Sequence, residues 1–333
     1  MGDRAPATRV NHTRIYRDGA LVEDGFPAGE LHARLSADER NVGWLDLCRP
    51  NPEELSLLAD QFGLHPLAVE DILQQAQRAK LDHYDTHLFL NTYVALLGTA
   101  DRLSTGEVSA FITDRLLVTV RYDDQFDVVD LMRRWDESAE LARNGVSYLL
   151  YGLLDALIDG HFEAVQRLDS ALEKLQDDMF QGRDLPRNNI QRRVFLARRD
   201  LVRLRQIALP MREVVNAVLR PTVHLVTTEM IPYYQDVYDH VIRVIEWTES
   251  LRDLNTTMLE TNLMLQNNQM NAVVKQVTGW AAVIAVPTAV TGFFGQNLNF
   301  PWRHTPMEFY ISVAVTLGLA LLMYVIFRVK KWL

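Results

Sequence analysis

Two charge-free apolar runs near the end of the chain place the tightest constraint on what it can fold into. Residues 277–294 and 309–327 contain no Asp, Glu, Lys or Arg. Each is close to the ~20 residues that an α-helix needs to cross a ~30 Å hydrocarbon core. The chain before these runs carries charge at the density of a soluble protein. We therefore expect a large domain outside the bilayer, followed by a two-helix transmembrane hairpin.

Basic residues predict how this hairpin is oriented. Lys275 precedes the first run and three basic residues follow the second, whereas the connecting loop at 298–307 contains only Arg303. Because Lys and Arg are enriched in cytoplasmic flanks, we expect both chain ends in the cytoplasm. The hairpin would then cross the cell (inner) membrane, with its loop on the external side. The first residues lack the apolar stretch of a secretory signal, which fits a cytoplasmic front domain.

Residues 1–145 have the pattern of a mixed α/β domain. Two apolar segments predict buried strands, and residues 109–122 predict a hairpin that turns near Asp114. Asn51 is placed to cap a helix that begins at the following proline, and Gly63 is placed to end it. Neither GxGxxG nor GxxxxGK[ST] occurs, so a phosphate-binding loop is not predicted.

Residues 146–232 have helical periodicity and predict an antiparallel helical hairpin that is interrupted near Gly182 and Pro186, with a kink at Pro210. The second of these helices is rich in arginine. Because the chain has a net charge of −9 and apolar residues alternate with the arginines, we interpret this side as an ion-paired, solvated face and not as a nucleic-acid surface. Its arginines are Arg192, Arg193, Arg198, Arg199, Arg203 and Arg205.

Residue types that carry enzymatic or metal chemistry are sparse in the front domain. His83 and His87 could ligate a metal together, but no HExxH pattern or third ligand accompanies them, and the alternative is two partly exposed histidines beside a strand. The single cysteine, Cys48, excludes an intrachain disulfide and is interpreted as a core residue. Without a nucleophile–base pair, an enzyme is not predicted.

A long helix follows. The 54 residues from Tyr233 to Val286 contain no proline and one glycine, and their periodicity continues into the first apolar run. A rod of this length needs packing partners. The chain is accordingly divided into an α/β domain (1–145), a helical hairpin (146–232), a stalk helix continuing into the first membrane helix (233–297), an external loop (298–307), and a second membrane helix with a basic tail (308–333).

One face of this long helix combines small and polar residues. Within the membrane, lipid-facing positions prefer large apolar side chains, whereas helix interfaces and aqueous pores favour small and hydroxylated ones. Spacing alone leaves two interpretations open, a water-filled path and tight helix packing. Successive members are three or four residues apart: Glu260, Met264, Asn267, Asn271, Val274, Thr278, Ala281, Ala285, Thr288 and Gly292.

A second column of neutral polar residues repeats every seven positions on roughly the opposite face of the same helix. Apolar residues alternate with it, as in a heptad seam whose polar positions set the register. We expect this column to face neighbouring helices. Its members are Thr248, Asn255, Asn262, Gln269 and Gln276, alternating with Leu251, Met258, Leu265 and Ala272.

The segment GQN at 295–297 lies where the first membrane helix should end. Gly295 allows the backbone to leave helical geometry, while Gln296 and Asn297 supply uncharged amides. A helix C-terminus also carries partial negative charge, which favours a cation. Repeated around a symmetric oligomer, these groups would hold a hydrated cation, and Mg²⁺ is the divalent ion that keeps its waters most readily.

These residues resemble a known family. GQN is similar to the Gly-Met-Asn signature of CorA-type magnesium channels, the two-transmembrane GxN proteins. The segments YYQDVYDHVIRVIEWTESLRDLN, QMNAVVKQVT, VPTAVTGFFGQNLNF and VKKWL resemble family segments in the same order. LAVEDILQQAQRAKLDHY resembles part of the family's cytosolic domain. The resemblance covers essentially the whole chain and is most specific from Asp236 to Phe300.

The resemblance implies a funnel-shaped homopentamer embedded in membrane lipid. Divalent ions bound between its cytosolic domains would gate the uptake of Mg²⁺, with Co²⁺ or Ni²⁺ as further candidates. It places Gly295, Gln296 and Asn297 in an outer selectivity ring. Glu260 is implied on the pore side, and Asp236 at a regulatory divalent site. The implied pore-lining residues are Asn271, Val274, Thr278, Ala285 and Thr288, and the small and polar stripe adds Ala281 and Gly292 to the predicted lining.

Two features depart from the family pattern. Gln296 stands where the family has methionine, and the external loop carries Arg303 and His304 where the family loop is acidic. Basic groups would repel cations at the entrance. These departures leave room for a Zn²⁺ transporter of the same architecture, which could be proton-coupled, or for a magnesium channel with altered affinity. A separate alternative is a non-conducting membrane-anchored metal sensor.

Overall fold

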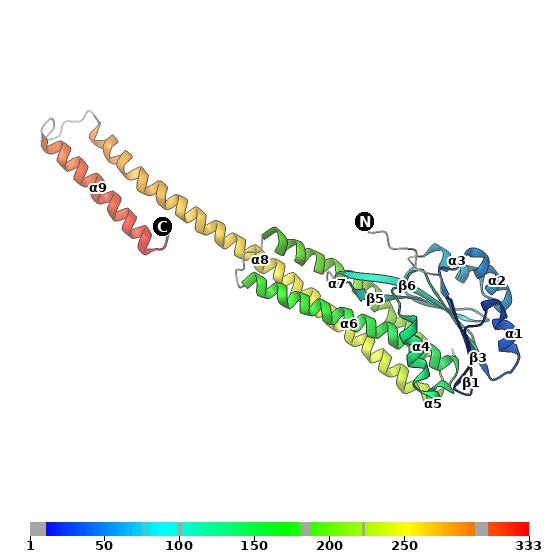
Figure 1. Cartoon of the computed structure of the whole chain (residues 1–333). Coiled ribbons are helices and arrows are strands. Elements are labelled where there is room, and N and C mark those ends of the chain that lie inside the picture. The colour runs from blue at the N-terminus through cyan, green and yellow to red at the C-terminus, as the bar shows by residue number, and fades with distance from the viewer. Residues whose placement is uncertain are drawn as a thin grey trace. The chain divides into compact units, whose positions relative to one another are not determined.

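The computed structural model describes residues 11–75, 77–98, 102–180, 187–221, 224–296 and 306–332 (Figure 1). The chain divides into two compact units, Met1–Thr256 and Thr257–Leu333. The described residues of the first unit form a seven-stranded sheet with the order β2-β1-β3-β7-β6-β5-β4. Its strands are β1 (His12–Arg17), β2 (Ala20–Asp24), β3 (Asn41–Cys48), β4 (Lys80–His83), β5 (Leu88–Leu97), β6 (Leu103–Ile112) and β7 (Leu116–Arg121).

The sheet is mixed. β3 pairs with β7 in parallel, and the other paired strands are antiparallel. The predicted hairpin is confirmed, because β6 and β7 pair as Ile112 with Leu117 on either side of Asp114. Side chains of consecutive residues point to opposite faces of a strand. Leu117 and Val118 accordingly belong to two separate hydrophobic cores.

Helices cover both faces of this sheet. One core is formed with α1 (Leu31–Ser36), α2 (Pro52–Phe62) and α3 (Pro66–Gln74), after a short 3₁₀ turn η1 (Ala28–Glu30). The other core is formed with the helices that follow the sheet. These are α4 (Val128–Asp136), α5 (Ala139–Ala142), α6 (Val146–Phe180), α7 (Arg187–Val218) and, after η3 (Thr228–Met230), the start of α8 (Ile231–Phe294).

The helix signals in the sequence act as expected in α2. The Asn51 side chain accepts a hydrogen bond from the Glu54 backbone N–H at 2.8 Å, and the Glu54 carboxylate accepts one from the Asn51 N–H at 3.0 Å. This capping box satisfies two otherwise unpaired donors. Gly63 ends the helix in the left-handed conformation at φ 63°, which a glycine adopts without a Cβ penalty.

The long helices agree closely with expectation. α6 begins at Val146 as predicted, and α7 stays helical through Pro210. α8 begins at Ile231 and continues through Pro287 to Phe294, close to the expected range of 233–297. The arginine-rich side of α7 is ion-paired in part, since Arg193 contacts Asp178 at 2.8 Å and Arg205 contacts Glu249.

The predicted seam on α8 is confirmed in the first unit. Thr248, Leu251 and Asn255 are buried. The Asn255 side-chain amide donates to the Val194 carbonyl of α7 at 3.1 Å. This polar contact fixes the register of the two helices, whereas the seam positions beyond Thr256 remain a prediction.

The expectation for the two histidines is wrong in part. His83 is exposed, but His87 is buried, with its ring 5.0 Å from that of Tyr84 and 5.6 Å from that of Phe111. Aromatic packing therefore accounts for His87. Cys48 is buried as expected.

A buried ion pair joins β3 to β7. Arg121 Nε donates to Asp46 Oδ2 at 2.9 Å, and Thr119 donates to the other carboxylate oxygen at 2.8 Å. Burial raises the pKa of Asp46, against the attraction of Arg121. Removing one partner of such a pair leaves an uncompensated charge in the interior.

We expect Arg121→Met to lower the free energy of unfolding by about 3–5 kcal/mol, because Asp46 would lose its counter-charge. Denaturant unfolding of the full chain, followed by fluorescence, measures the change. The double variant Asp46→Leu, Arg121→Met is the control and should be distinctly more stable than the single variant. Equal stability of the single and double variants would contradict this role for the pair.

Candidate functional site

The second unit contains the end of α8 and the helix α9 (Pro306–Val329), drawn in orange and red in Figure 1. Both helices contain stretches long and apolar enough to cross a membrane. Only 6% of the apolar window in α8 and none of that in α9 is buried. An apolar core helix would be enclosed by its own chain, so the exposure of these stretches suits contact with lipid or with other subunits.

The small and polar stripe of α8 is exposed along its length in this unit. Its members at three- and four-residue spacing lie on one face of the helix. Val274 is 54% exposed, and the flanking positions are exposed as well. The exposed set comprises Glu260, Asn271, Val274, Thr278, Ala281, Ala285, Thr288 and Gly292.

Two other faces of the same helix segment differ from the stripe. Gly279 and Val290 are buried on one of them, and the neighbouring Trp280 ring lies 6.4 Å from that of Tyr324 in α9. The third face presents large exposed apolar side chains, including Val273 and Ile284. The stripe is therefore the small-residue face, and α9 leaves it uncovered.

The end of α8 is built from weakly polar groups. Thr291 donates to the Pro287 carbonyl at 2.8 Å, and the Gly295 N–H donates to the Thr291 carbonyl at 2.9 Å. Pro287 has no N–H, so the Val283 carbonyl loses its usual helical partner. A Cβ at Gly295 would lie 3.1 Å from the Thr291 oxygen. Glycine thus allows the backbone to turn closely over the last helical carbonyls.

The predicted selectivity ring is described in part. Gly295 and Gln296 follow the helix and are exposed, and the Gln296 N–H donates to the Phe293 carbonyl at 3.2 Å. Asn297 and the external-loop residues up to 305 lie outside the described residues.

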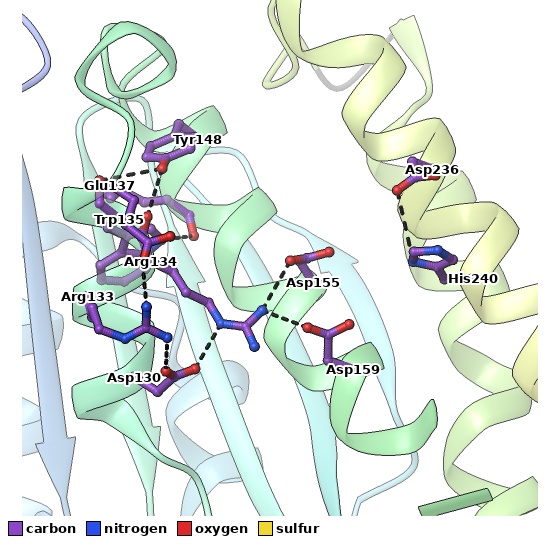
Figure 2. A network of polar contacts seen from close by, with 11 residues as sticks. Asp130, Arg133, Arg134, Trp135, Glu137, Tyr148, Asp155, Asp159, Asp236 and His240 are labelled. Carbon is purple, nitrogen blue, oxygen red and sulfur yellow. Dashed lines mark hydrogen bonds and ion pairs between the residues drawn. The ribbon is translucent and has the colours of Figure 1, made fainter. Parts of the chain in front are cut away.

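Asp236, the predicted regulatory residue, lies near the start of α8 in the first unit. Its carboxylate is 67% exposed and lies 3.9 Å from His240 Nδ1, one turn further along (Figure 2).

Two further carboxylates in this region were missed by sequence reasoning. Asp155 and Asp159, one turn apart on α6, both contact Arg134 Nη1, at 3.4 and 2.6 Å (Figure 2). Arg134 Nε also contacts Asp130 at 2.8 Å. The i, i+4 spacing of the two aspartates on one helix was the available signal.

The carboxyl of Asp155 interacts electrostatically with Asp236 as well as with Asp159 and Arg134. Burial and then the neighbouring Asp159 carboxylate raise the pKa of Asp155. Arg134 and His240 oppose this rise, and Asp236 adds to it. Asp155, Asp159 and Asp236 therefore form an electrostatically coupled group, which we call the α6–α8 acidic group. Among the described residues of one chain, no three His, Cys, Asp or Glu side chains are placed to hold a metal ion.

Comparison with known proteins decides the family. The model of the CorA-like Mg²⁺ transporter proteins matches residues 39–331. The chain belongs to the CorA family. This CorA-family chain is 31% identical, over 279 residues, to the cobalt/magnesium transport protein CorA of Thermotoga maritima, covering 82% of this chain and 78% of that protein.

Solved structures agree with this CorA assignment at the level of the fold. The complete CorA magnesium transporter of Methanocaldococcus jannaschii matches with a TM-score of 0.77 at 20% identity, covering 98% of this chain and 99% of the other. Full-length CmaX matches with a TM-score of 0.72, also at 20% identity, covering 96% and 97%. The chain therefore shares the fold of full-length CorA, with an α/β domain, a long helix and two C-terminal apolar helices.

Replacing Asp155 tests whether the clustered carboxylates of the α6–α8 acidic group destabilise the folded state of this CorA-family chain. A carboxyl whose pKa is raised by folding destabilises the folded state at neutral pH, and the penalty disappears as the pH falls through that pKa. We expect Asp155→Asn to raise the midpoint of thermal unfolding by about 2–4 °C at neutral pH. The gain should shrink as the pH is lowered.

Glu163→Gln, at an exposed position of the same helix, is the control and should leave the midpoint unchanged. A lower midpoint for Asp155→Asn would show that the ion pair with Arg134 outweighs burial and repulsion.

Proposed function

We propose that this chain is one subunit of a homopentameric, funnel-shaped divalent-cation channel in the cell (inner) membrane that takes up Mg²⁺. The family model and the relative from Thermotoga maritima, a cobalt/magnesium transport protein, support a transporter and not an enzyme. Co²⁺ and Ni²⁺ are further candidate substrates. Both chain termini lie in the cytoplasm in this proposal.

The observation that carries the proposal is the uncovered stripe of α8. Small and hydroxylated side chains from Thr278 to Gly292 stay exposed while α9 packs along another face. A single helix cannot enclose water, but five copies with this face turned inward would line a narrow path. Large apolar residues on the third face would then face neighbouring subunits or lipid.

Selection takes place where α8 ends. Gly295, Gln296 and Asn297 from five subunits would surround the axis with amide groups and backbone carbonyls. Mg²⁺ dehydrates reluctantly and keeps several waters in most of its sites. A ring of neutral acceptors binds those waters without trapping the ion as a carboxylate cage would. Glu260, on the same side of the helix, attracts the ion at the inner end of the path.

Transport is passive and driven by the membrane potential. One elementary charge gains about 2.3 kcal/mol per 100 mV, so a divalent ion gains about twice that on moving inward. No coupling reaction is required.

The α6–α8 acidic group supplies the regulation. Divalent ions bound between neighbouring first units, with Asp236 as a ligand, hold a closed state. Asp155 and Asp159 add negative charge beside Asp236. When the ions leave, the carboxylates repel one another and favour opening.

A Zn²⁺ transporter of the same architecture is the second candidate. The observation that favours it is Gln296 at the position of the family's methionine, together with Arg303 and His304 in the loop. Uptake of Mg²⁺, Co²⁺, Ni²⁺ and Zn²⁺ into proteoliposomes at two external pH values separates the candidates. Mg²⁺ uptake that is independent of the pH gradient supports the first.

A matched pair of substitutions tests conduction itself. Ala281→Leu adds bulk to the stripe, and Ala314→Leu makes the same change at an exposed position of α9. We expect Ala281→Leu to reduce Mg²⁺ flux by at least about tenfold, because the leucine side chains of the five subunits would fill the single water-filled passage of the proposed pentamer. Ala314→Leu should conduct normally. A sensor that does not conduct would show no flux in any of the three proteins.

Asp236→Ala tests the regulation. We expect this variant to need several-fold more internal Mg²⁺ to suppress the current, because each regulatory site loses a charged ligand. The control is Asp239→Ala, which removes an exposed carboxylate from the same helix. An unchanged Mg²⁺ dependence in Asp236→Ala would end the regulatory proposal and leave conduction untouched.

A further inference from the structure

A cavity of about 1,100 Å³ lies within the first unit, between α7 and a wall formed by β5, β6, the residues just before β4 and those just after β7. It is separate from α8, α9 and the α6–α8 acidic group. Small-molecule sites are typically concave spaces of about 300–1,000 Å³ with mixed apolar and polar walls. This cavity has the size of such a site, and ion conduction does not use it.

The α7 wall is basic. Arg199 and Arg203, one turn apart, line the cavity together with Gln206 and Pro210. Arg203 donates to the Thr105 hydroxyl of β6 at 2.7 Å, which holds its guanidinium across the cavity. Pro210 has no N–H, so the Gln206 carbonyl lacks its helical donor. This wall offers two guanidinium groups.

The sheet wall adds aromatic and polar groups. Arg78 lines it beside Tyr93 and Tyr122. The Tyr122 hydroxyl is buried and has no hydrogen-bond partner within the described residues. Burial and the nearby Glu107 carboxylate raise the pKa of Tyr122, so the hydroxyl keeps its proton and can donate. Because this hydroxyl is enclosed by protein, Tyr122 contributes its ring and not its hydroxyl to the cavity wall.

The charges around the cavity favour an anion. Four arginines line it, with Arg205 engaged by Glu249, against the carboxylates Glu107 and Asp123. Asp123 already accepts from the Gln125 N–H at 3.0 Å and from the Gln125 side chain at 3.2 Å. Arg78, Arg199 and Arg203 therefore outnumber the two lining carboxylates, and Arg199 Nε also lies 3.8 Å from Asp200.

We propose that this cavity binds a nucleotide-sized organic phosphate. The planar guanidinium groups of Arg199 and Arg203 match phosphate oxygens in pairs. The tyrosine rings and the apolar side chains of Val202 and Leu209 provide a surface for a planar base. The side chains of Gln77 and Gln206, which also line the cavity, provide amide donors and acceptors for its polar edge. A bare phosphate would leave most of the volume and all of these groups unused.

Calorimetry with the full chain in lipid nanodiscs tests this site. ATP is titrated in the presence of EDTA, so that chelation of divalent ions cannot produce the signal. Pyrophosphate and adenosine are titrated separately to divide the contribution of the phosphates from that of the base. We expect saturable ATP binding that is tighter than binding of either fragment.

Matched variants locate the ligand. Arg199→Glu and Arg203→Glu should each weaken ATP binding by about tenfold or more, since each loses a charge-assisted contact and gains repulsion. Arg198→Glu makes the same charge change at an exposed neighbouring position outside the cavity and should bind ATP normally. Val202→Trp fills the cavity without changing its charge and should abolish binding. It remains informative if a charge reversal disturbs folding.

Three results would overturn the proposal: no saturable ATP binding, equal losses in the Arg198→Glu and Arg203→Glu variants, or full affinity in Val202→Trp. Pyrophosphate binding as tightly as ATP would overturn the assignment to a nucleotide-sized ligand. Because calorimetry needs no ion flux, failure here leaves the transport proposal standing, and failure of transport leaves this site standing.

Discussion

The hydrogen-bonding demand of the backbone inside a membrane is the constraint on which this structure depends. Hydrocarbon offers no partners to N–H and C=O groups, so an apolar segment of this length must be helical. The proposed route for a hydrated ion therefore uses one face of the helix and its end. In α8 that face is small and weakly polar from Thr278 to Gly292, and Gly295 lets the chain turn over the Thr291 carbonyl.

Local physics made much of the fold predictable. Charge-free runs identified the two apolar helices, the cap at Asn51 and the glycine at Gly63 marked α2, and the seven-residue repeat identified Asn255 as a seam residue. Contacts between distant segments were beyond such reasoning. The parallel pairing of β3 with β7 and the burial of His87 depend on how the sheet closes, which periodicity does not encode.

The candidate site likewise has residues that local sequence predicts and residues that only the fold brings together. Its α8 residues follow from helical spacing and from the resemblance to CorA channels, and the family is established by the match over residues 39–331. Asp155 and Asp159 were missed because their significance depends on their proximity to Asp236 of α8. The two helices approach one another only in the folded chain. The alternation of arginines and apolar residues in α7 predicts one solvated face, yet in the fold Arg199 and Arg203 line a cavity and Arg198 lies outside it.

The proposed conduction requires that the small face of α8 borders water. Cys48 is the only cysteine in the chain, so a Cys48→Ala background accepts single cysteines at Thr278, Ala281, Ala285 and Thr288, with Trp280 and Ile284 as controls. A charged, water-soluble thiol reagent should modify the first four positions and block Mg²⁺ flux, while sparing the two controls. Modification of Trp280→Cys and Ile284→Cys, with the stripe positions protected, would contradict the claim.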